Sequence, residues 1–359
     1  MKIFVITILM SPYQVELFDE IAKLENVDLL VGYLTSQDPT RMWSTSKPRH
    51  KFSVLMESDE KHSWEEFAVS ADIVIFSNWT YRYVRHLIRI RRRSRLPWVF
   101  WGERPGFNHL GIFSKLLRWF LLSDLRLTSA PIWGIGAFAI EGYKCEFGLN
   151  RQYFNVPYYS DLSRFRQSEL DTNYEDKSRV ILYSGSLIKR KGVDVLADAF
   201  ALARFQHAEL KLRFVGSGPL ELDLRKKLLK FGDAVTFVGF KDWGDLPEEY
   251  GKAHFLCVPS RYDGWGLVVP EGLAAGLPII ASDRVGAARE MVVDGQNGWN
   301  FRTGSTTDLS KILSNLATMP WAQYRSLSER SVASSCRYDV KVGAVTFCRT
   351  ARTVIRQWC

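Results

Sequence analysis

Short apolar runs alternate with amphipathic segments along the chain, and this pattern predicts a succession of strands and helices. The runs 2–9 and 179–184 are almost continuously apolar, which is typical of parallel strands buried on both faces. Segments such as 15–24 and 193–203 carry apolar residues at helical spacing. The alternation predicts an α/β protein built on parallel, doubly wound sheets. Further strands are expected at 27–34, 72–77, 97–101, 131–136, 153–158, 211–215, 235–240, 254–258 and 279–282, and further helices at 82–95, 112–125 and 138–147.

The length of the chain and one polar stretch predict two domains. A chain of 359 residues exceeds what a single hydrophobic core usually supports. The stretch 159–177 is polar, rich in acids and poor in apolar periodicity, so we interpret it as a linker. We therefore expect one Rossmann-like domain over 1–158, a second over 178–335, and a C-terminal helix over 336–359.

The composition indicates a soluble protein. The hydrophobic fraction of 46% is ordinary for such a protein, and no apolar run approaches the roughly 20 residues of a membrane span. The apolar N-terminal segment lacks a small-residue cleavage site, so a first strand is favoured over a signal peptide. The five cysteines are scattered and form no Cys-x-x-Cys pair, which indicates reduced thiols in a cytosolic protein and no zinc site.

The net charge of +9 suggests an acidic partner. Seven arginines and no acid lie between Arg82 and Arg95. Such a helix can contact nucleic acid, an anionic membrane surface or a phosphorylated acceptor, or it can be an ordinary solvated face. No nucleic-acid-binding signature accompanies it, so nucleic acid is disfavoured as a partner. The aromatic and basic segment 112–125 is interpreted as a core helix, with membrane contact as the alternative.

The stretch 260–278 combines a Gly-x-Gly loop, the start of a helix and two acids. Pro270 falls in the first turn of this helix, where its missing N–H is harmless. Backbone amides at a helix start favour an anion, and the amides concerned are those of Gly266, Leu267 and Val268. Asp263 and Glu271 flank the loop, and carboxylates beside a phosphate are better suited to bind sugar hydroxyls. The combination predicts a sugar-nucleotide site, with a generic strand–helix turn as the alternative.

Two other turns follow predicted strands of the second domain. Arg190 and Lys191 lie in the turn 185–192, where a planar guanidinium and a mobile ammonium can hold phosphate, although the spacing is not that of a P-loop. The turn 216–219 contains Gly216 and Gly218 in a Gly-x-Gly-Pro sequence. A Gly-x-Gly alone is weak support for a ligand site, because a tight turn explains it equally well.

In the first domain, polar residues follow two strands at the edge where open α/β sheets bind ligands. Ser11 and Tyr13 come after the first strand, and an ordinary turn is an equally good interpretation. Glu103 follows the strand 97–101 beside Arg104. Its carboxylate is a candidate to orient or deprotonate an acceptor hydroxyl, and an exposed Glu–Arg pair is the alternative.

The stretch 260–278 resembles the signature of retaining glycosyltransferase family 4, within the glycosyl transferases group 1. That family has an acid, seven residues and then Glu. Here Asp263 stands where the family more often has Glu, and Trp265 where it often has Phe. The similarity extends over roughly 180–301. It implies the GT-B fold, which is two Rossmann-like domains facing each other across a cleft, with the C-terminal helix crossing back to the first domain.

The resemblance also implies roles for the residues. Lys191 matches the family's phosphate-binding lysine, whereas Ser186 stands where the family usually has arginine, and Arg190 is the nearest substitute. Asp263 would contact the transferred sugar, and Glu271 the ribose. The family places the turns with Gly216, Gly218, Gly239 and Phe240 near the nucleotide, and those with Ser11 and Tyr13 near the acceptor.

The implied activity is retaining transfer of a hexosyl group from a nucleotide-diphosphate sugar to a glycan or lipid-linked acceptor. Bacterial surface polysaccharide synthesis, including lipopolysaccharide, is the expected setting. No metal and no cofactor are expected, because cationic side chains and amides can neutralise the diphosphate. We expect the protein in the cytoplasm. The arginine-rich helix extends this expectation to peripheral attachment at the inner face of the plasma membrane.

Three other classes of protein are compatible with parts of the sequence. A GT-B sugar-nucleotide epimerase shares the fold, but the element with Asp263 and Glu271 favours transfer. A non-catalytic nucleic-acid-binding protein is suggested only by the charge. A nicotinamide dehydrogenase is disfavoured, because no Gly-x-Gly-x-x-Gly follows the first strand.

Overall fold

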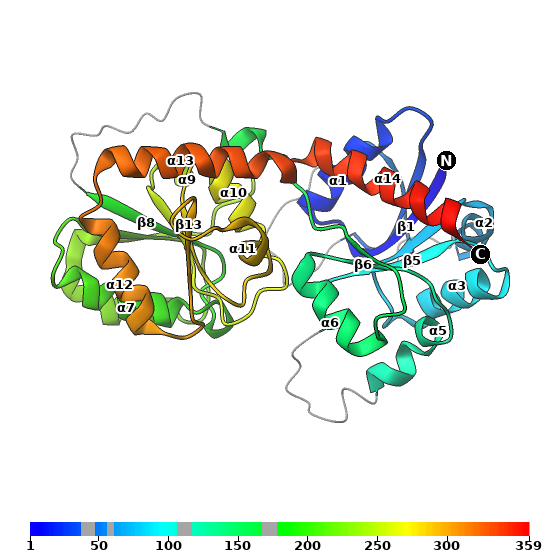
Figure 1. Ribbon diagram of the computed structural model, residues 1–359, viewed down its shortest axis with the longest axis horizontal. Coiled ribbons are helices and arrows are strands. Elements are labelled where there is room, and N and C mark those ends of the chain that lie inside the picture. Colours follow the sequence, from blue (N-terminus) through cyan, green and yellow to red (C-terminus); the bar gives the residue numbers. More distant parts are fainter. Residues whose placement is uncertain (37–46, 56–60, 106–116, 167–177, 359) are drawn as a thin grey trace. The chain divides into compact units, whose positions relative to one another are not determined.

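The structure, a computed structural model, describes residues 1–36, 47–55, 61–105, 117–166 and 178–358 (Figure 1). The chain divides into two compact units. Unit 1 consists of Met1–Asp161 together with Val340–Cys359, and unit 2 is Leu162–Asp339. Most of the predicted linker, 167–177, and the first part of the predicted helix 112–125 lie outside the described residues.

Unit 1 contains a seven-stranded parallel sheet in the order β3-β2-β1-β4-β5-β6-β7. The register pairs Lys2 with Asp28 and Ile3 with Ile73, so β1 lies between β2 and β4. The direction of the strand order reverses at this point. The strands are β1 (Lys2–Leu9), β2 (Asp28–Thr35), β3 (Lys51–Val54), β4 (Ile73–Phe76), β5 (Trp98–Gly102), β6 (Ile132–Gly134) and β7 (Tyr153–Asn155).

Helices connect these strands and cover the sheet. They are α1 (Pro12–Ala22), α2 (Lys61–Ser70), α3 (Arg82–Arg93), α5 (Ser123–Arg126), α6 (Ala137–Phe147) and α14 (Val340–Gln357). The last of them, α14, packs against α1. Its residue Phe347 is buried, with ring centroids 5.5 Å from Trp101 and 5.0 Å from Trp133. The core of unit 1 is therefore completed by a helix that follows unit 2 in the chain.

A buried polar cluster attaches the residues before β3 to α1. His50 Nδ1 lies 2.6 Å from Asp19 Oδ1, and its Nε2 lies 3.0 Å from the Tyr33 hydroxyl. The backbone N–H groups of Arg49 and His50 also donate to Asp19 Oδ1. Burial lowers the pKa of His50 below its usual 6.5, although the hydrogen bond and charge of Asp19 oppose this effect. The imidazole is therefore held as a neutral, structural group.

Unit 2 contains a six-stranded parallel sheet in the order β10-β9-β8-β11-β12-β13. The strand order reverses between β8 and β11. In doubly wound sheets, ligands bind at the carboxyl ends of the strands beside such a reversal. The strands are β8 (Arg179–Ser184), β9 (Leu210–Val215), β10 (Val235–Gly239), β11 (Phe255–Val258), β12 (Ile279–Ser282) and β13 (Gly298–Phe301).

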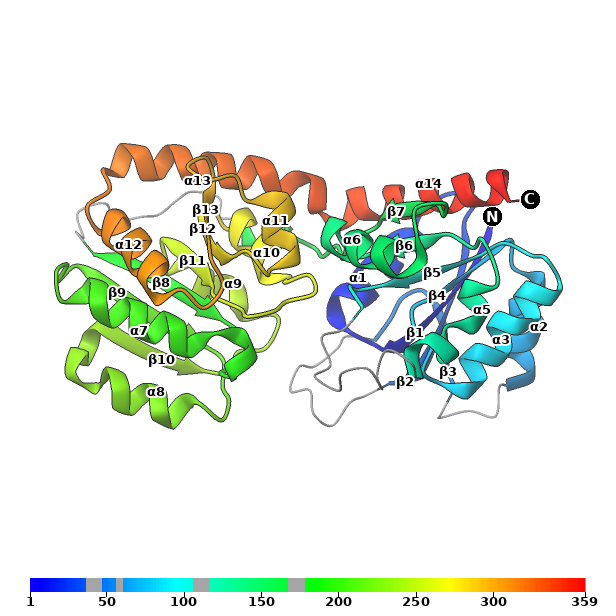
Figure 2. The ribbon, with the colours of Figure 1, turned by 60° about the horizontal axis from the view of Figure 1, so that its bottom comes forward.

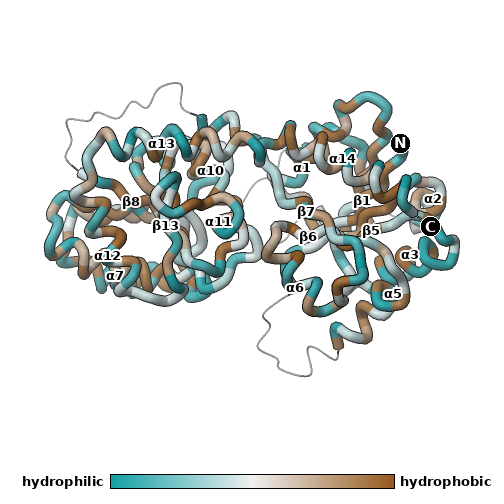
Figure 3. Tube along the Cα trace, in the orientation of Figure 1, coloured by the Kyte–Doolittle hydropathy of each residue, from teal (hydrophilic) through white to brown (hydrophobic). Residues whose placement is uncertain are grey.

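The helices of unit 2 form two groups around its sheet: α7 packs against α8 and α12, and α10 packs against α11 and α13 (Figure 2). The central strands β11 and β12 are almost entirely apolar, and the helices bury apolar faces on the sheet. The colours of Figure 3 show how hydrophobic and hydrophilic residues alternate along the rest of the chain. The α-helices are α7 (Val193–Arg204), α8 (Glu221–Leu228), α9 (Leu246–Gly251), α10 (Val268–Ala274), α11 (Gly286–Met291), α12 (Thr306–Ala317) and α13 (Trp321–Ser335). The 3₁₀ turns are η1 (Ser163–Phe165), η2 (Lys189–Lys191), η3 (Leu229–Ala234) and η4 (Cys336–Tyr338).

Candidate active site

The two loops beside the strand-order reversal of unit 2 carry an ion pair. One loop, 185–192, follows β8, and the other, 259–267, follows β11. Lys191 Nζ lies 2.5 Å from Asp263 Oδ2, and the two side chains are 21% and 12% exposed. The structure thus brings together two residues that the sequence predicts to be catalytic, although they are 72 positions apart in the chain.

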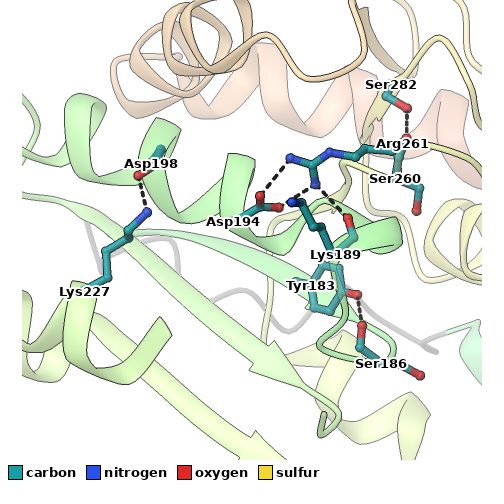
Figure 4. A network of polar contacts seen from close by, with 9 residues as sticks. All are labelled: Tyr183, Ser186, Lys189, Asp194, Asp198, Lys227, Ser260, Arg261 and Ser282. Carbon is teal, nitrogen blue, oxygen red and sulfur yellow. Dashed lines mark hydrogen bonds and ion pairs between the residues drawn. The ribbon is translucent and has the colours of Figure 1, made fainter. Parts of the chain in front are cut away.

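A second ion pair joins the loop 259–267 to the start of α7, directly after the loop 185–192. The Arg261 guanidinium donates to both carboxylate oxygens of Asp194 at 2.6 and 2.7 Å and to the Lys189 carbonyl at 2.7 Å (Figure 4). The hydrogen bonds to Asp194 raise the pKa of Arg261. Burial opposes ionisation of Asp194, but the hydrogen bonds and charge of Arg261, with backbone amides, lower the pKa of its carboxyl. A bidentate pair of this kind fixes geometry as well as charge.

Arg190 adds a third connection between the loops. Its side chain donates to the Tyr262 carbonyl at 2.8 Å, and its own carbonyl accepts from the backbone N–H of Arg261 at 2.8 Å. The Arg190 side chain was predicted to bind phosphate. In the structure one of its donors is used on the neighbouring loop, and a guanidinium has five.

Close backbone contacts explain two of the glycines in this region. Gly192 has a φ of +70°, and a Cβ there would lie 2.0 Å from the Pro259 carbonyl oxygen. Gly216 has a φ of +128°, and a Cβ there would lie 2.0 Å from the Gly185 carbonyl oxygen. A side chain at either position would separate the turns that build the site.

The predicted turns after β9 and β10 lie against the turn after β8. The Gly216 N–H donates to the Gly239 carbonyl at 2.7 Å, and the Leu187 N–H donates to the Ser217 carbonyl at 2.9 Å. A Cβ at Gly218 would lie 2.6 Å from the Leu187 carbonyl oxygen. The predicted nucleotide-side residues therefore share one edge of the sheet. Of the other two predicted residues here, Phe240 is exposed, and Ser186 is exposed with its carbonyl accepting from the Tyr183 hydroxyl (Figure 4).

The helix of the signature stretch begins earlier than its proline suggests. It starts at Val268, so Pro270 is the third residue of α10. The N–H groups of Val269 and Glu271 already donate to the carbonyls of Gly266 and Leu267. The amides of Gly266, Leu267 and Val268, which were predicted to bind an anion, come just before these hydrogen-bonded N–H groups. They lie at the same edge of the sheet as Asp263. The Asp263 backbone is held by the Arg284 carbonyl and by the N–H of Gly286.

Glu271 is buried in unit 2, with 1% of its surface exposed. Its Oε2 accepts a hydrogen bond of 3.0 Å from the hydroxyl of Tyr250, which lies in α9. Burial, and then the charge of Glu271, raise the pKa of Tyr250 well above its usual 10.0. The sequence analysis did not single out Tyr250. A tyrosine in a short amphipathic segment gives no signal of the carboxylate that it contacts.

In unit 1, the structure connects two predicted acceptor-side residues through a third. The Tyr158 hydroxyl hydrogen-bonds to the side chains of Tyr13 and Glu103, and the rings of Tyr13 and Tyr158 are 4.7 Å apart. Burial, then the charges of Tyr13 and Glu103, raise the pKa of Tyr158. Ser11 instead is buried and donates to Gln14 Oε1 at 3.1 Å, so it serves as part of the start of α1.

The arginine-rich helix α3 is only partly a surface feature. Arg91 is fully buried and donates to the backbone carbonyls of Ala68, Ala71, Asp72 and Pro97, which means that it cannot contribute to a membrane-facing surface. Burial lowers its pKa to about 10. Arg89 and Arg92 pair with Asp124 of α5 at 3.5 and 2.9 Å. The exposed arginines of this stretch are Arg82, Arg89, Arg93 and Arg95.

No group of three or more His, Cys, Asp or Glu side chains suited to a metal ion occurs within 1–36, 47–55, 61–105, 117–166 and 178–358. Across the same residues, no helix combines the length and apolar character needed to cross a bilayer.

Together, the two parallel-sheet units define a GT-B glycosyltransferase fold, as the sequence predicts. The structure of Anabaena HepE in complex with UDP superimposes with a TM-score of 0.78 at 17% identity, covering 98% of this chain and 100% of that one. The apo form of the lipopolysaccharide outer core galactosyltransferase WaaB gives a TM-score of 0.72 at 17% identity, covering 98% and 99%.

Unit 2 also matches a family model by sequence. Residues 166–331 match the model of glycosyl transferases group 1, and the predicted resemblance to group 1 is confirmed. An uncharacterized glycosyltransferase of Methanocaldococcus jannaschii is 28% identical over 169 residues, covering 42% of this chain and 46% of that protein. The chain thus matches about half the length of this curated relative.

Proposed function

We propose that this protein is a retaining glycosyltransferase that moves a hexosyl group from a nucleotide-diphosphate sugar to a glycan or lipid-linked acceptor. The observation that carries the proposal is the Lys191–Asp263 pair at the strand-order reversal of a group 1 domain. A cation beside a carboxylate suits a ligand that presents a diphosphate next to a sugar. Phosphate would attract Lys191, and sugar hydroxyls would donate to Asp263.

In the proposed donor site of unit 2, each residue has a separate task. Lys191, with Arg190 and the amides at 266–268, neutralises the charge that develops on the leaving diphosphate. Asp263 accepts hydrogen bonds from the transferred hexose near the reacting carbon, and Glu271 accepts from the ribose. Donor binding replaces the Lys191–Asp263 ion pair with contacts to phosphate and sugar.

In unit 1, we assign Glu103 to orient the attacking hydroxyl of the acceptor, with Tyr13 beside it. Their shared hydrogen bonds to Tyr158 support this assignment, because they hold both side chains at one position of unit 1. Retention of configuration requires the acceptor to attack from the face that the diphosphate leaves. The departing phosphate oxygen can then receive the acceptor proton, which makes a second protein carboxylate unnecessary.

The setting that we propose is bacterial surface polysaccharide synthesis at the cytoplasmic face of the plasma membrane. WaaB, a lipopolysaccharide galactosyltransferase by name, supports this setting by its similar fold. A specific observation favours peripheral membrane contact: Trp119 and Phe120 are 51% and 65% exposed. They precede α5, which α3 contacts through Asp124. Exposed aromatic rings near arginines suit the surface of an anionic bilayer.

A thermal-shift screen tests the donor class, because a ligand that binds only the folded state raises the midpoint of unfolding. We expect a UDP-hexose, a GDP-hexose or an ADP-hexose to stabilise the protein, with UDP-hexoses first since HepE is known in complex with UDP. Incubation of the stabilising sugar nucleotide without an acceptor separates transfer from epimerisation. An epimerised donor in that incubation would contradict the proposal.

Steady-state kinetics with the donor so identified separates the two acids. A ribose contact is made equally in the ground state and the transition state, so Glu271→Gln should chiefly raise the donor KM. A contact to the transferred sugar tightens as the anomeric carbon gains positive charge, so Asp263→Asn should chiefly lower kcat. The reverse pattern would mean that the two roles are exchanged. Unchanged kinetics in both variants would mean that this stretch is only scaffold.

A further inference from the structure

A buried tyrosine of α9 contacts the carboxylate that we assign to the ribose. The Tyr250 hydroxyl lies 3.0 Å from Glu271 Oε2, and both side chains are almost completely buried. A carboxylate without a hydrogen-bond donor is costly in such a place, so this contact has a structural value in any case. The geometry around the contact also bears on how Glu271 binds the donor.

The tyrosine ring has little freedom to move. It is 0% exposed, and its centroid lies 5.0 Å from that of Phe165 in η1. Both α9 and α10, which carry Tyr250 and Glu271, contact η1. The hydroxyl is therefore presented to Glu271 from a fixed direction.

The hydroxyl is also connected to the end of β8. Ser184, the last residue of that strand, hydrogen-bonds to the Tyr250 hydroxyl, and because the only proton of that hydroxyl goes to Glu271, Ser184 donates and Tyr250 accepts. Tyr250 then uses its single proton on Glu271. The hydrogen bonds run in one direction, from Ser184 to Tyr250 and from Tyr250 to the Glu271 carboxylate, and each bond polarises the next. It joins the strand before Lys191 to the helix that follows Asp263.

We propose that Tyr250 is a positioning residue, which orients the Glu271 carboxylate toward the ribose hydroxyls of the donor nucleotide. This inference rests on the proposed function. A carboxylate offers about four acceptor positions. The ring of Tyr250 is fixed, and its hydroxyl occupies one of these positions at Oε2. The Glu271 carboxylate is therefore held in a single orientation, and its side chain loses less conformational entropy when the nucleotide binds.

The test is the affinity of Tyr250→Phe for UDP, GDP and ADP, compared with their 2′,3′-dideoxy analogues by calorimetry. The substitution removes one oxygen and keeps the ring. For the ribonucleotide that binds the wild type, we expect about tenfold weaker binding, as for a lost hydrogen bond to a charged group. For its dideoxy analogue, which offers no ribose hydroxyls, we expect no change beyond about twofold. Equal losses for both ligands would overturn the inference, since a merely structural role weakens them alike.

A mutant cycle and a matched control sharpen the result. In the Glu271→Gln background, Tyr250→Phe should cause no further loss of affinity, because the group that it orients is already altered. The control is Tyr324→Phe, which removes a hydroxyl from another fully buried tyrosine of unit 2. The ring of Tyr324 packs on His254 and Phe255, at the opposite end of β11 from the loop 259–267. Ligand affinity in the control should stay at the wild-type value, and a ribose-selective loss there would also overturn the inference.

Ser184→Ala provides a milder variant should Tyr250→Phe fail to fold. It leaves the tyrosine and the carboxylate in place, and we expect a ribose-selective loss of about threefold. An equal loss of affinity for the dideoxy analogue, or no loss for either ligand, would contradict a role of the Ser184–Tyr250–Glu271 hydrogen bonds in positioning the carboxylate. Failure of the inference is distinguishable from failure of the proposed function. A wild type that binds none of the three nucleotides overturns the function, whereas a wild type that binds one, with a non-selective Tyr250→Phe, overturns only the positioning role.

Discussion

Replacing Lys191 by alanine removes the cation at the centre of the proposed donor site. The substitution deletes the Nζ group that lies 2.5 Å from Asp263 Oδ2 and keeps the backbone of η2. A preorganised charge beside a leaving group is worth about 3 kcal/mol of transition-state stabilisation. At about 1.4 kcal/mol per factor of ten, turnover should therefore fall about 100-fold.

The same substitution affects stability, and the size of that effect can be bounded. Exposed ion pairs contribute about 0–1 kcal/mol, whereas removal of one partner from a buried pair costs about 3–5 kcal/mol. Lys191 and Asp263 are 21% and 12% exposed, so their pair lies between these limits. We expect a loss of about 2 kcal/mol, which lowers the melting temperature of a unit of this size by roughly 4–8 °C.

The assay is release of the nucleoside diphosphate with saturating donor and acceptor, at a temperature where circular dichroism shows each variant folded. Lys189→Ala is the matched control, because this residue of the same turn is exposed and its carbonyl, which Arg261 uses, remains. The control should keep wild-type turnover. Wild-type turnover in folded Lys191→Ala would refute the assignment of the cation.

Three other predictions concern the whole protein and unit 1. Transfer should persist in excess chelator, and loss of activity that magnesium or manganese restores would contradict the electrostatic account. Replacing Arg82, Arg93 and Arg95 together by Gln should weaken binding to anionic vesicles by roughly 1 kcal/mol per arginine, and binding to neutral vesicles should not change. The measurement is co-sedimentation, and equal binding of the wild type to both kinds of vesicle would exclude an electrostatic contact with the membrane. Burial lowers the pKa of His50, so the unfolded state binds more protons below about pH 6.5 and unit 1 should lose stability as pH falls through this range. Urea unfolding at about pH 7.5 and about pH 5.5 should show a smaller difference for His50→Gln than for the wild type, and an equal difference would remove His50 as the cause.

Buried parallel strands were the most predictable elements of this chain. The predicted strands 179–184 and 279–282 coincide with β8 and β12, because strands covered on both faces are apolar at nearly every position. The strand β3 was not predicted. It lies at the edge of its sheet with two of its four residues exposed, and so it lacks an apolar run. The start of α10 was also uncertain from sequence, since Pro270 is compatible with any position in a first turn.

The residues of the candidate site were predictable where they follow strands, and their partners were not. Lys191 and Asp263 could be placed on one edge because parallel strands end at the same side of a sheet. Tyr250 and Asp194 were missed, since helices position them against residues that are distant in sequence. Arg91 is the opposite case, because the sequence analysis grouped it with a charged helix and the structure buries it. Arg89 and Arg93, two positions away on either side, are exposed, and only the packing of α3 turns Arg91 toward four backbone carbonyls.

The position of α14 in unit 1 has a consequence for how the chain folds during synthesis. Unit 2 is continuous, Leu162–Asp339, and all of its core residues are available once Asp339 has been made. Unit 1 lacks α14, whose Phe347 packs on Trp101 and Trp133, until the segment Val340–Cys359 has been made. The half that is translated first is thus the half that reaches its final packing last, the reverse of the usual N-terminal-first order. A stop codon early in α14 would accordingly spare unit 2 and leave the aromatic core of unit 1 open to water and to chaperones.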